Sequence, residues 1–240
     1  MEFHVYKTAQ EACEAAAMIF AAQILRKSDS VLGLATGSTP IPCYEKLAQW
    51  YEQGMIDFSK IVTFNLDEYV GIDYKNPLSY HAFMDENLFS KVNVNKDNVH
   101  LPSGDTDEDG KAYDAAIKAA GGVDIQLLGI GRNGHIGFNE PDDVFTYGTH
   151  IVTLAEDTID ANARFFASAD EVPRQALTMG IKSIMQAKTI LVVVNGKGKA
   201  EAVYKTICGP VTPEVPASIL QLHPCCVILA DEEAASLMKA

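Results

Sequence analysis

The sequence predicts an α/β protein built on an open, mostly parallel β-sheet with helices on both faces. Short apolar runs, many of them β-branched, alternate along the chain with longer segments of helical spacing. This alternation is typical of open α/β sheets. Most of the runs are apolar on both sides, as expected of strands that helices cover on each face.

The predicted elements follow one another without a break in composition. Strands are predicted at 31–36 (VLGLAT), 61–66 (IVTFNL), 124–130 (DIQLLGI), 189–195 (TILVVVN) and 225–230 (CCVILA). Helices are predicted near 9–27, 40–54, 79–90, 107–121, 170–187 and 197–206, and DEEAASLMK (231–239) is typical of the cap and first turn of a last helix. Because no repeat or Ser/Gly linker divides the chain, we expect one domain over 1–240.

Composition and charge exclude several classes of protein. The chain has 240 residues, of which 48% are hydrophobic, so it can bury a sizeable core. Its formal net charge of -13 argues against nucleic-acid binding and against a polybasic membrane contact.

The cysteines and the N-terminus indicate a cytoplasmic protein. The five cysteines are odd in number and form no C-x-x-C pair, which is typical of reduced thiols in the cytosol. The first residues lack the basic start and apolar block of a signal peptide, and no stretch is expected to span a membrane.

Ligands of open α/β sheets bind at the carboxyl ends of the strands, and polar residues follow four of the predicted strands. After the first, Gly37 permits a tight turn, and Ser38 or Thr39 is expected to cap a helix with Pro40 in its first turn. Amides at such a helix start bind anions, although an ordinary capped turn has the same spacing. The lysine of a Walker P-loop is missing.

The second strand runs into TFNLDEYVG, where two carboxylates are adjacent. Asp67 is a candidate base, since an ordinary aspartate with a pKa of ~4 is ionised at neutral pH. The alternative is that Asp67 and Glu68 only cap the next turn.

The third strand leads into GIGRNGHIGFNEP (129–141). The stretch fits G-x-G-x-x-G, but Gly134, Gly137 and Pro141 interrupt the helix that a dinucleotide site requires. A catalytic His135 is favoured over a structural one, because Asn133 and Glu140 share its loop and a carboxylate can set the tautomer of an imidazole.

The fourth strand is followed by NGKGK, with Lys197 and Lys199 at the start of a helix, where the helix dipole disfavours cations. A phosphate would explain them, and Arg164 is a further candidate for gripping one; a solvated lysine pair is the alternative. Together the four strand ends predict a small phosphorylated substrate and proton-transfer chemistry. No zinc-ligand spacing and no G-x-S-x-G elbow occurs.

Five motifs, LATGSTP, TFNLDEYVG, GIGRNGHIGFNEP, ANARFF and LQLHP, resemble the glucosamine-6-phosphate deaminase family in order and across nearly the whole chain. The resemblance implies a Rossmann-like fold and conversion of glucosamine 6-phosphate and water to fructose 6-phosphate and ammonia. It also implies no metal or organic cofactor and no partner besides the hexosamine phosphate.

The resemblance also implies roles for single residues. Asp67 would move the proton from C2 to C1, and His135, oriented by Glu140, would open the sugar ring. Some members carry Asp where this chain has Asn133, which can form hydrogen bonds but carries no charge. The implied phosphate-binding residues are Gly37, Ser38, Thr39, Arg164 and Lys199.

Regulation follows from the same resemblance. Allosteric members carry basic residues where this chain reads THIVT (149–153), so we expect an unregulated enzyme. A monomer is favoured, and the mixed character of the segment about 142–168, which contains Arg164, indicates a lid. A 6-phosphogluconolactonase is disfavoured because IGFNEP replaces its Ser-Leu-Phe-Pro. A sugar-phosphate sensor is disfavoured because no helix-turn-helix segment is present.

Overall fold

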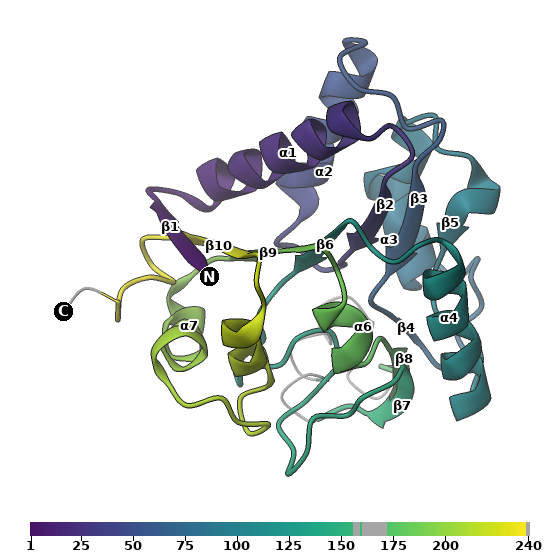
Figure 1. Cartoon of the computed structure of the whole chain (residues 1–240). Coiled ribbons are helices and arrows are strands. Elements are labelled where there is room, and N and C mark those ends of the chain that lie inside the picture. The colour runs from purple at the N-terminus through teal and green to yellow at the C-terminus, as the bar shows by residue number, and fades with distance from the viewer. Residues whose placement is uncertain (156–158, 160–171, 239–240) are drawn as a thin grey trace.

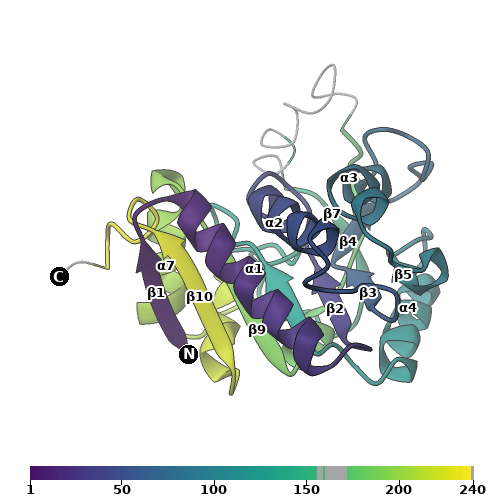
Figure 2. The same ribbon diagram turned by 90° about the horizontal axis from the view of Figure 1, so that it is seen from above.

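The computed structural model describes residues 1–155, 159 and 172–238, and its centre is a seven-stranded sheet with all neighbouring strands parallel. The strands run in the order β1-β10-β9-β6-β2-β3-β5 across the sheet (Figure 2). Their bounds are β1 Glu2–Tyr6, β2 Val31–Leu34, β3 Val62–Asn65, β5 Val99–His100, β6 Ile125–Leu128, β9 Thr189–Val194 and β10 Cys226–Asp231.

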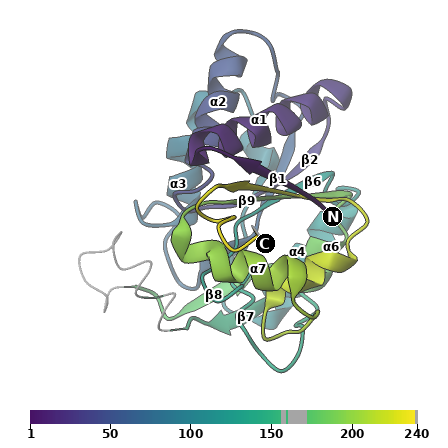
Figure 3. The ribbon, with the colours of Figure 1, turned by 90° about the vertical axis from the view of Figure 1, so that its left-hand side faces the viewer.

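Helices lie on both faces of this sheet. Helices α1 and α2 cover one face, and α6 and α7 cover the other (Figures 1 and 3). The helices are α1 Ala9–Arg26, α2 Ile41–Glu52, α3 Tyr80–Asn87, α4 Asp107–Ala119, α6 Ile181–Met185 and α7 Ala200–Cys208. Short 3-10 turns are formed by Phe89–Lys91, Lys96–Asn98, Lys197–Lys199 and Pro216–Leu222. The predicted fold class is therefore confirmed.

A second, antiparallel sheet of three short strands lies on the side of α4 and α6 (Figure 1). Its order is β4-β8-β7, with β4 Asp67–Tyr69, β7 His150–Thr153 and β8 Gln175–Thr178. Because only Leu66 separates the end of β3 from the start of β4, the chain passes directly from the carboxyl edge of the large sheet into the small one. The prediction did not include this sheet.

The core explains why the central strands read as uniformly apolar. Every residue of β2 and β6 is buried, and so are the last five residues of β9. Helix α1 begins where the Thr8 hydroxyl accepts a hydrogen bond from the Glu11 amide, and it packs an alanine-rich face on the sheet. The buried strands and this face form one continuous cluster.

One predicted helix is wrong, and the predicted last helix does not extend beyond its first turn. The segment 170–187 holds β8 and only the short α6 among its described residues, because β8 pairs with both β4 and β7. After β10 the Asp231 carboxylate accepts the Ala234 amide at 2.7 Å, and the Ala235 amide donates to the Asp231 carbonyl at 3.0 Å, so a cap and one turn form as predicted. No helix continues from them through the described residues 232–238.

The start of α2 also differs from expectation. The cap position belongs to Pro40, with no side-chain hydrogen bond, so neither Ser38 nor Thr39 caps the helix. Among the described residues, no helix is long and apolar enough to cross a membrane.

Candidate active site

The site lies where the strand order of the large sheet reverses. From β2 the chain continues through β3 to β5 on one side, and then returns to β6 on the other. The crevice between the carboxyl ends of β2 and β6 is the position where open α/β sheets bind ligands. The four predicted loops follow β9, β6, β2 and β3, which are consecutive neighbours in the sheet. The sheet therefore brings the four strand ends to one edge.

The loop after β6 is a tight turn built around glycines. The Gly131 amide donates to the His135 carbonyl at 2.9 Å, and the Gly134 amide donates to the Gly131 carbonyl at 3.1 Å. The ring of His135 lies directly against Gly131, since a Cβ added there would stand 2.4 Å from Nδ1 and Cε1 of the imidazole. Gly131 is therefore required for the close approach of the ring.

Asn133, His135 and Glu140 form one hydrogen-bonded group. Asn133 donates from Nδ2 to Oε2 of Glu140 at 2.7 Å, and its Oδ1 accepts the His135 amide at 3.2 Å. Nδ1 of His135 lies 3.3 Å from the same Oε2 of Glu140. As an amide, Asn133 can bond both neighbours, whereas a carboxylate there could not donate to Glu140. Glu140 is thus placed to fix the tautomer and the orientation of the imidazole.

Asp67 reaches the same loop from β4. A Cβ added to Gly137, two residues beyond His135, would lie 3.5 Å from Oδ2 of Asp67 and 3.1 Å from Oγ1 of Thr178. Thr178 faces Asp67 across the β4–β8 pair and accepts the Phe138 amide at 3.0 Å. The small sheet therefore holds the predicted base against the loop that carries the imidazole.

The environment of Asp67 changes its acid–base behaviour. Only 6% of the residue is exposed, and burial, with a further contribution from the charge of Glu68, raises its pKa to about 8. The expectation of an ordinary, fully ionised aspartate at neutral pH is thus wrong. A carboxylate with a raised pKa is a stronger base, which suits the removal of a proton from carbon.

Glu68, unlike Asp67, caps the start of helix α3. Its carboxylate accepts the amides of Tyr69, Tyr80 and His81, each at 3.0 Å, and the last two belong to the first turn of α3. Burial raises the pKa of Glu68, and these backbone hydrogen bonds oppose the rise. The capping interpretation is therefore right for Glu68 alone.

The predicted phosphate-binding residues are spread over two loops. Gly37 adopts φ +89, with open space where a Cβ would stand, and Ser38 beside it is exposed. The Thr39 hydroxyl donates to Oδ1 of Asn195 at 3.0 Å. Lys199 donates from Nζ to the Ile130 carbonyl at 2.7 Å, which brings this amine to the start of the His135 loop.

Two other predictions extend beyond the described part of the chain. Arg164 lies outside the described residues, as does most of the second half of the predicted lid, 142–168. The first half of that segment contains β7. Among the described residues, no group of three His, Cys, Asp or Glu side chains is arranged to hold a metal ion.

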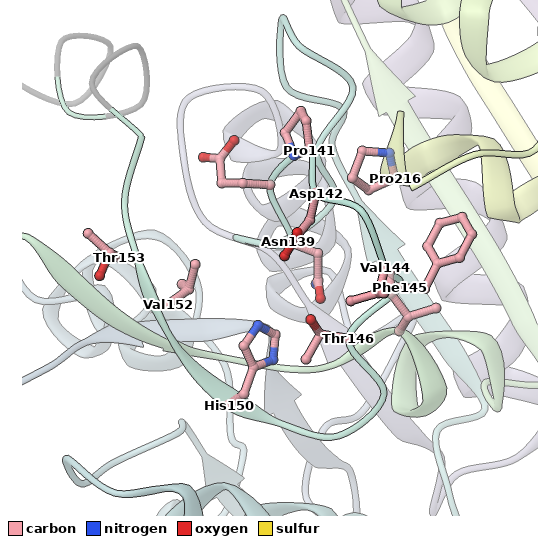
Figure 4. Close-up of a pocket in the computed structure, with 12 residues that line it drawn as sticks. Asn139, Pro141, Asp142, Val144, Phe145, Thr146, His150, Val152, Thr153 and Pro216 are labelled. Atoms are coloured by element: carbon pink, nitrogen blue, oxygen red, sulfur yellow. The ribbon is translucent and has the colours of Figure 1, made fainter. Parts of the chain in front are cut away.

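A cavity of about 190 Å³ adjoins the site, and Glu140 is among the residues that line it. Asn139, Thr146 and His150 point toward one another across it, from the loop and from β7 (Figure 4). Among the described residues that line it there is no lysine or arginine. The cavity therefore lacks the strongest partners of a phosphate group.

Sequence reasoning missed Asn195 and Thr178. Asn195 is the first polar residue after the apolar run of β9, and this signal could have identified it. Thr178 could not be found in the same way, because its position depends on the pairing of β4 with β8.

Comparisons with known proteins identify relatives of this chain. The family model "Glucosamine-6-phosphate isomerases/6-phosphogluconolactonase" matches residues 5–228. The glucosamine-6-phosphate deaminase of Thermoanaerobacter pseudethanolicus is 53% identical over 95% of this chain and 92% of its own length. That of Lachnoclostridium phytofermentans is 58% identical over 87% of this chain and 90% of its own.

Solved structures of other proteins have the same fold as this chain. One described as a monomeric glucosamine-6-phosphate deaminase superposes with a TM-score of 0.96, at 45% identity over 99% of this chain and 100% of that one. A 6-phosphogluconolactonase from Leishmania guyanensis reaches a TM-score of 0.74 at 18% identity, covering 100% of this chain and 99% of that one, which indicates a shared fold only.

Proposed function

Because the chain belongs to the glucosamine-6-phosphate isomerase/6-phosphogluconolactonase family, we propose that it is a glucosamine-6-phosphate deaminase. It converts glucosamine 6-phosphate and water into fructose 6-phosphate and ammonia. The observation that carries this proposal is the meeting of Asp67 with the loop of His135 and Glu140 at the switch point of the sheet. Identities of 53% and 58% to deaminases, against 18% to a lactonase, favour deamination over lactone hydrolysis.

His135 opens the sugar ring. As the bond between C1 and the ring oxygen breaks, the C1 hydroxyl loses a proton and the ring oxygen gains one. An imidazole can do both, because it serves as a general base when neutral and as a general acid when protonated. The Glu140 carboxylate lies 3.3 Å from Nδ1 and keeps a proton on this nitrogen. Nε2, on the other side of the imidazole, is then left for the substrate.

Asp67 then moves the proton that turns the aldose into the ketose. It takes the proton from C2 of the open-chain sugar and returns it to C1, while the C1 oxygen gains a proton and the nitrogen loses one, which leaves a C1 hydroxyl and an imine at C2. Water adds to this carbon and ammonia leaves, so atoms balance without a redox step. The buried position of Asp67 raises its basicity for the first of these transfers.

The phosphate is held at a distance from the chemistry by the loops after β2 and β9, through Gly37, Ser38, Thr39 and Lys199, together with Arg164. A fixed phosphate places C1 and C2 against the two catalytic groups, so its binding energy serves orientation. The Lys199 amine, next to the start of the His135 loop, fits a substrate that spans both regions.

The enzyme is an unregulated, cytoplasmic monomer of one domain. The cavity beside Glu140 has no lysine or arginine among its described lining residues, so an anionic effector finds no cation there. All five cysteines are free thiols, as in a reducing compartment. A hyperbolic rate curve that N-acetylglucosamine 6-phosphate leaves unchanged, and a monomeric mass in solution, would support this part of the proposal. A sigmoidal curve would contradict it.

The direct test is a coupled assay of the purified protein with glucosamine 6-phosphate. We expect equal amounts of ammonia and fructose 6-phosphate; hydrolysis of 6-phosphogluconolactone without deamination would reverse the assignment. The Asp67→Asn variant should still bind substrate but lose exchange of the C2 proton with deuterated water. Retained exchange would place the base elsewhere.

A further inference from the structure

The loops after β2 and β9 are joined by a hydrogen bond over the end of the strand between them. The Thr39 hydroxyl, in the loop after β2, donates to Oδ1 of Asn195, which directly follows β9, at 3.0 Å. Strands β2 and β9 are not neighbours, since β6 separates them. Two strand spacings amount to about 10 Å, so both loops lean toward each other to form this bond. Thr39 and Asn195 thus join the loops that follow the two neighbours of β6.

This bond determines which group can donate to a phosphate. The Thr39 hydroxyl has a single proton, and Asn195 accepts it. Bound phosphate oxygens need donors, so the Thr39 hydroxyl contributes no proton to the phosphate in this arrangement, and Thr39 can take part only through its backbone amide. The amide of Asn195 has two N–H groups on Nδ2, for which the described residues offer no hydrogen-bond partner. The donors that Thr39 lacks are therefore available on its partner.

The backbone beside Asn195 is fixed independently of any ligand. Gly196 adopts φ +86, and its amide donates to both carboxylate oxygens of Asp231, each at 3.0 Å. Three residues later Lys199 reaches the Ile130 carbonyl at the start of the His135 loop. Asn195 and Lys199 therefore belong to one hydrogen-bonded turn after β9, at the carboxyl edge of the sheet.

We propose that Asn195 is a phosphate-binding residue, which orients the Thr39 hydroxyl through Oδ1 and donates from Nδ2 to the phosphate of the substrate. This inference rests on the proposed function for the identity of the substrate, but its central measurement, the binding of inorganic phosphate, does not. Asn195 and Thr39 then act as one unit, with Lys199 supplying the charge.

The test compares Asn195→Leu and Asn195→Asp with the wild-type protein. Inorganic phosphate serves as the probe, in calorimetry and as a competitive inhibitor of glucosamine 6-phosphate. We expect Asn195→Leu to weaken phosphate binding and to raise KM by about 10- to 100-fold, as is typical when a hydrogen bond to a charged group is lost. Asn195→Asp should weaken phosphate binding further and raise KM further, because it replaces the donors with a negative charge. Thermal unfolding shows whether each variant is folded.

A matched control is Asn98→Leu, which removes another half-buried asparagine whose Nδ2 bonds a backbone carbonyl, that of Ile61. Phosphate binding should be unchanged in this variant. The double variant of Asn195→Leu with Thr39→Val should lose little more than the larger single loss, since coupled residues are not additive.

Four results would overturn the assignment. In Asn195→Leu, these are a phosphate affinity and KM equal to wild type, or a fall in melting temperature as the only effect of the substitution. The other two are strictly additive losses in the double variant and failure of the wild-type protein to bind phosphate. A wild-type protein that binds phosphate through Asn195 but releases no ammonia would instead refute the proposed function.

Discussion

Replacing Asp67 with asparagine should stabilise the free protein, and the gain should grow with pH. The pKa of Asp67 is about 8 in the folded protein and ~4 in an unfolded chain. Between these values the folded state binds the extra proton, so the native carboxyl lowers the stability progressively as pH rises from about 4 to about 8. Four pH units correspond to an upper limit on the order of 5 kcal/mol above pH 8, which residual solvent contact of the side chain will reduce.

Urea unfolding of the wild-type and Asp67→Asn proteins at pH 5 and pH 9 measures this effect. The difference in unfolding free energy should favour the variant by several kcal/mol more at pH 9 than at pH 5, because Asp67 is buried. Asp29→Asn, which removes an exposed carboxylate, is the control and should show no such growth. A difference that stays constant or shrinks as pH rises would refute the reasoning.

Three further predictions concern activity. Because Asp67 must be ionised to act as a base, kcat/KM should rise with pH up to about 8, and a plateau already at pH 6 would contradict its raised pKa. Asn133→Ala removes the hydrogen bonds of 2.7 and 3.2 Å that assemble the His135 group, so kcat should fall by about tenfold or more; unchanged kinetics would leave Asn133 without a role. Gly131→Ala should reduce kcat by about 100-fold with phosphate binding intact, because its Cβ would overlap the His135 ring, whereas Gly129→Ala has open space and should remain active.

The position of the candidate site residues at the ends of strands could be predicted from the sequence, because it depends on local patterns. Strands that are apolar on both faces can only be buried, and parallel strands expose their carboxyl ends at one edge of a sheet. This reasoning placed Asp67, His135 and Lys199 at strand ends, and the strand order confirms that the strands are neighbours. The group of Asn133, His135 and Glu140 was also accessible, since all three lie within eight residues of one loop.

The short strands were beyond local reasoning. The residues of β8 lie in a segment of helical spacing, and they form a strand only because β4 and β7 offer hydrogen-bonding partners on either side. The edge strand β1 alternates without an apolar run, and it is defined by its pairing with β10.

By itself, the sequence determined the fold class, the family motifs and the residue types that gather at the carboxyl edge of the sheet, because each follows from periodicity or from neighbours along the chain. Only the tertiary structure decided the proton affinity of Asp67, which comes from burial between β4, β8 and the His135 loop. It alone paired Thr39 with Asn195, 156 positions apart. Desolvation and hydrogen bonding between distant segments exist only once the chain is folded, and no local pattern encodes them.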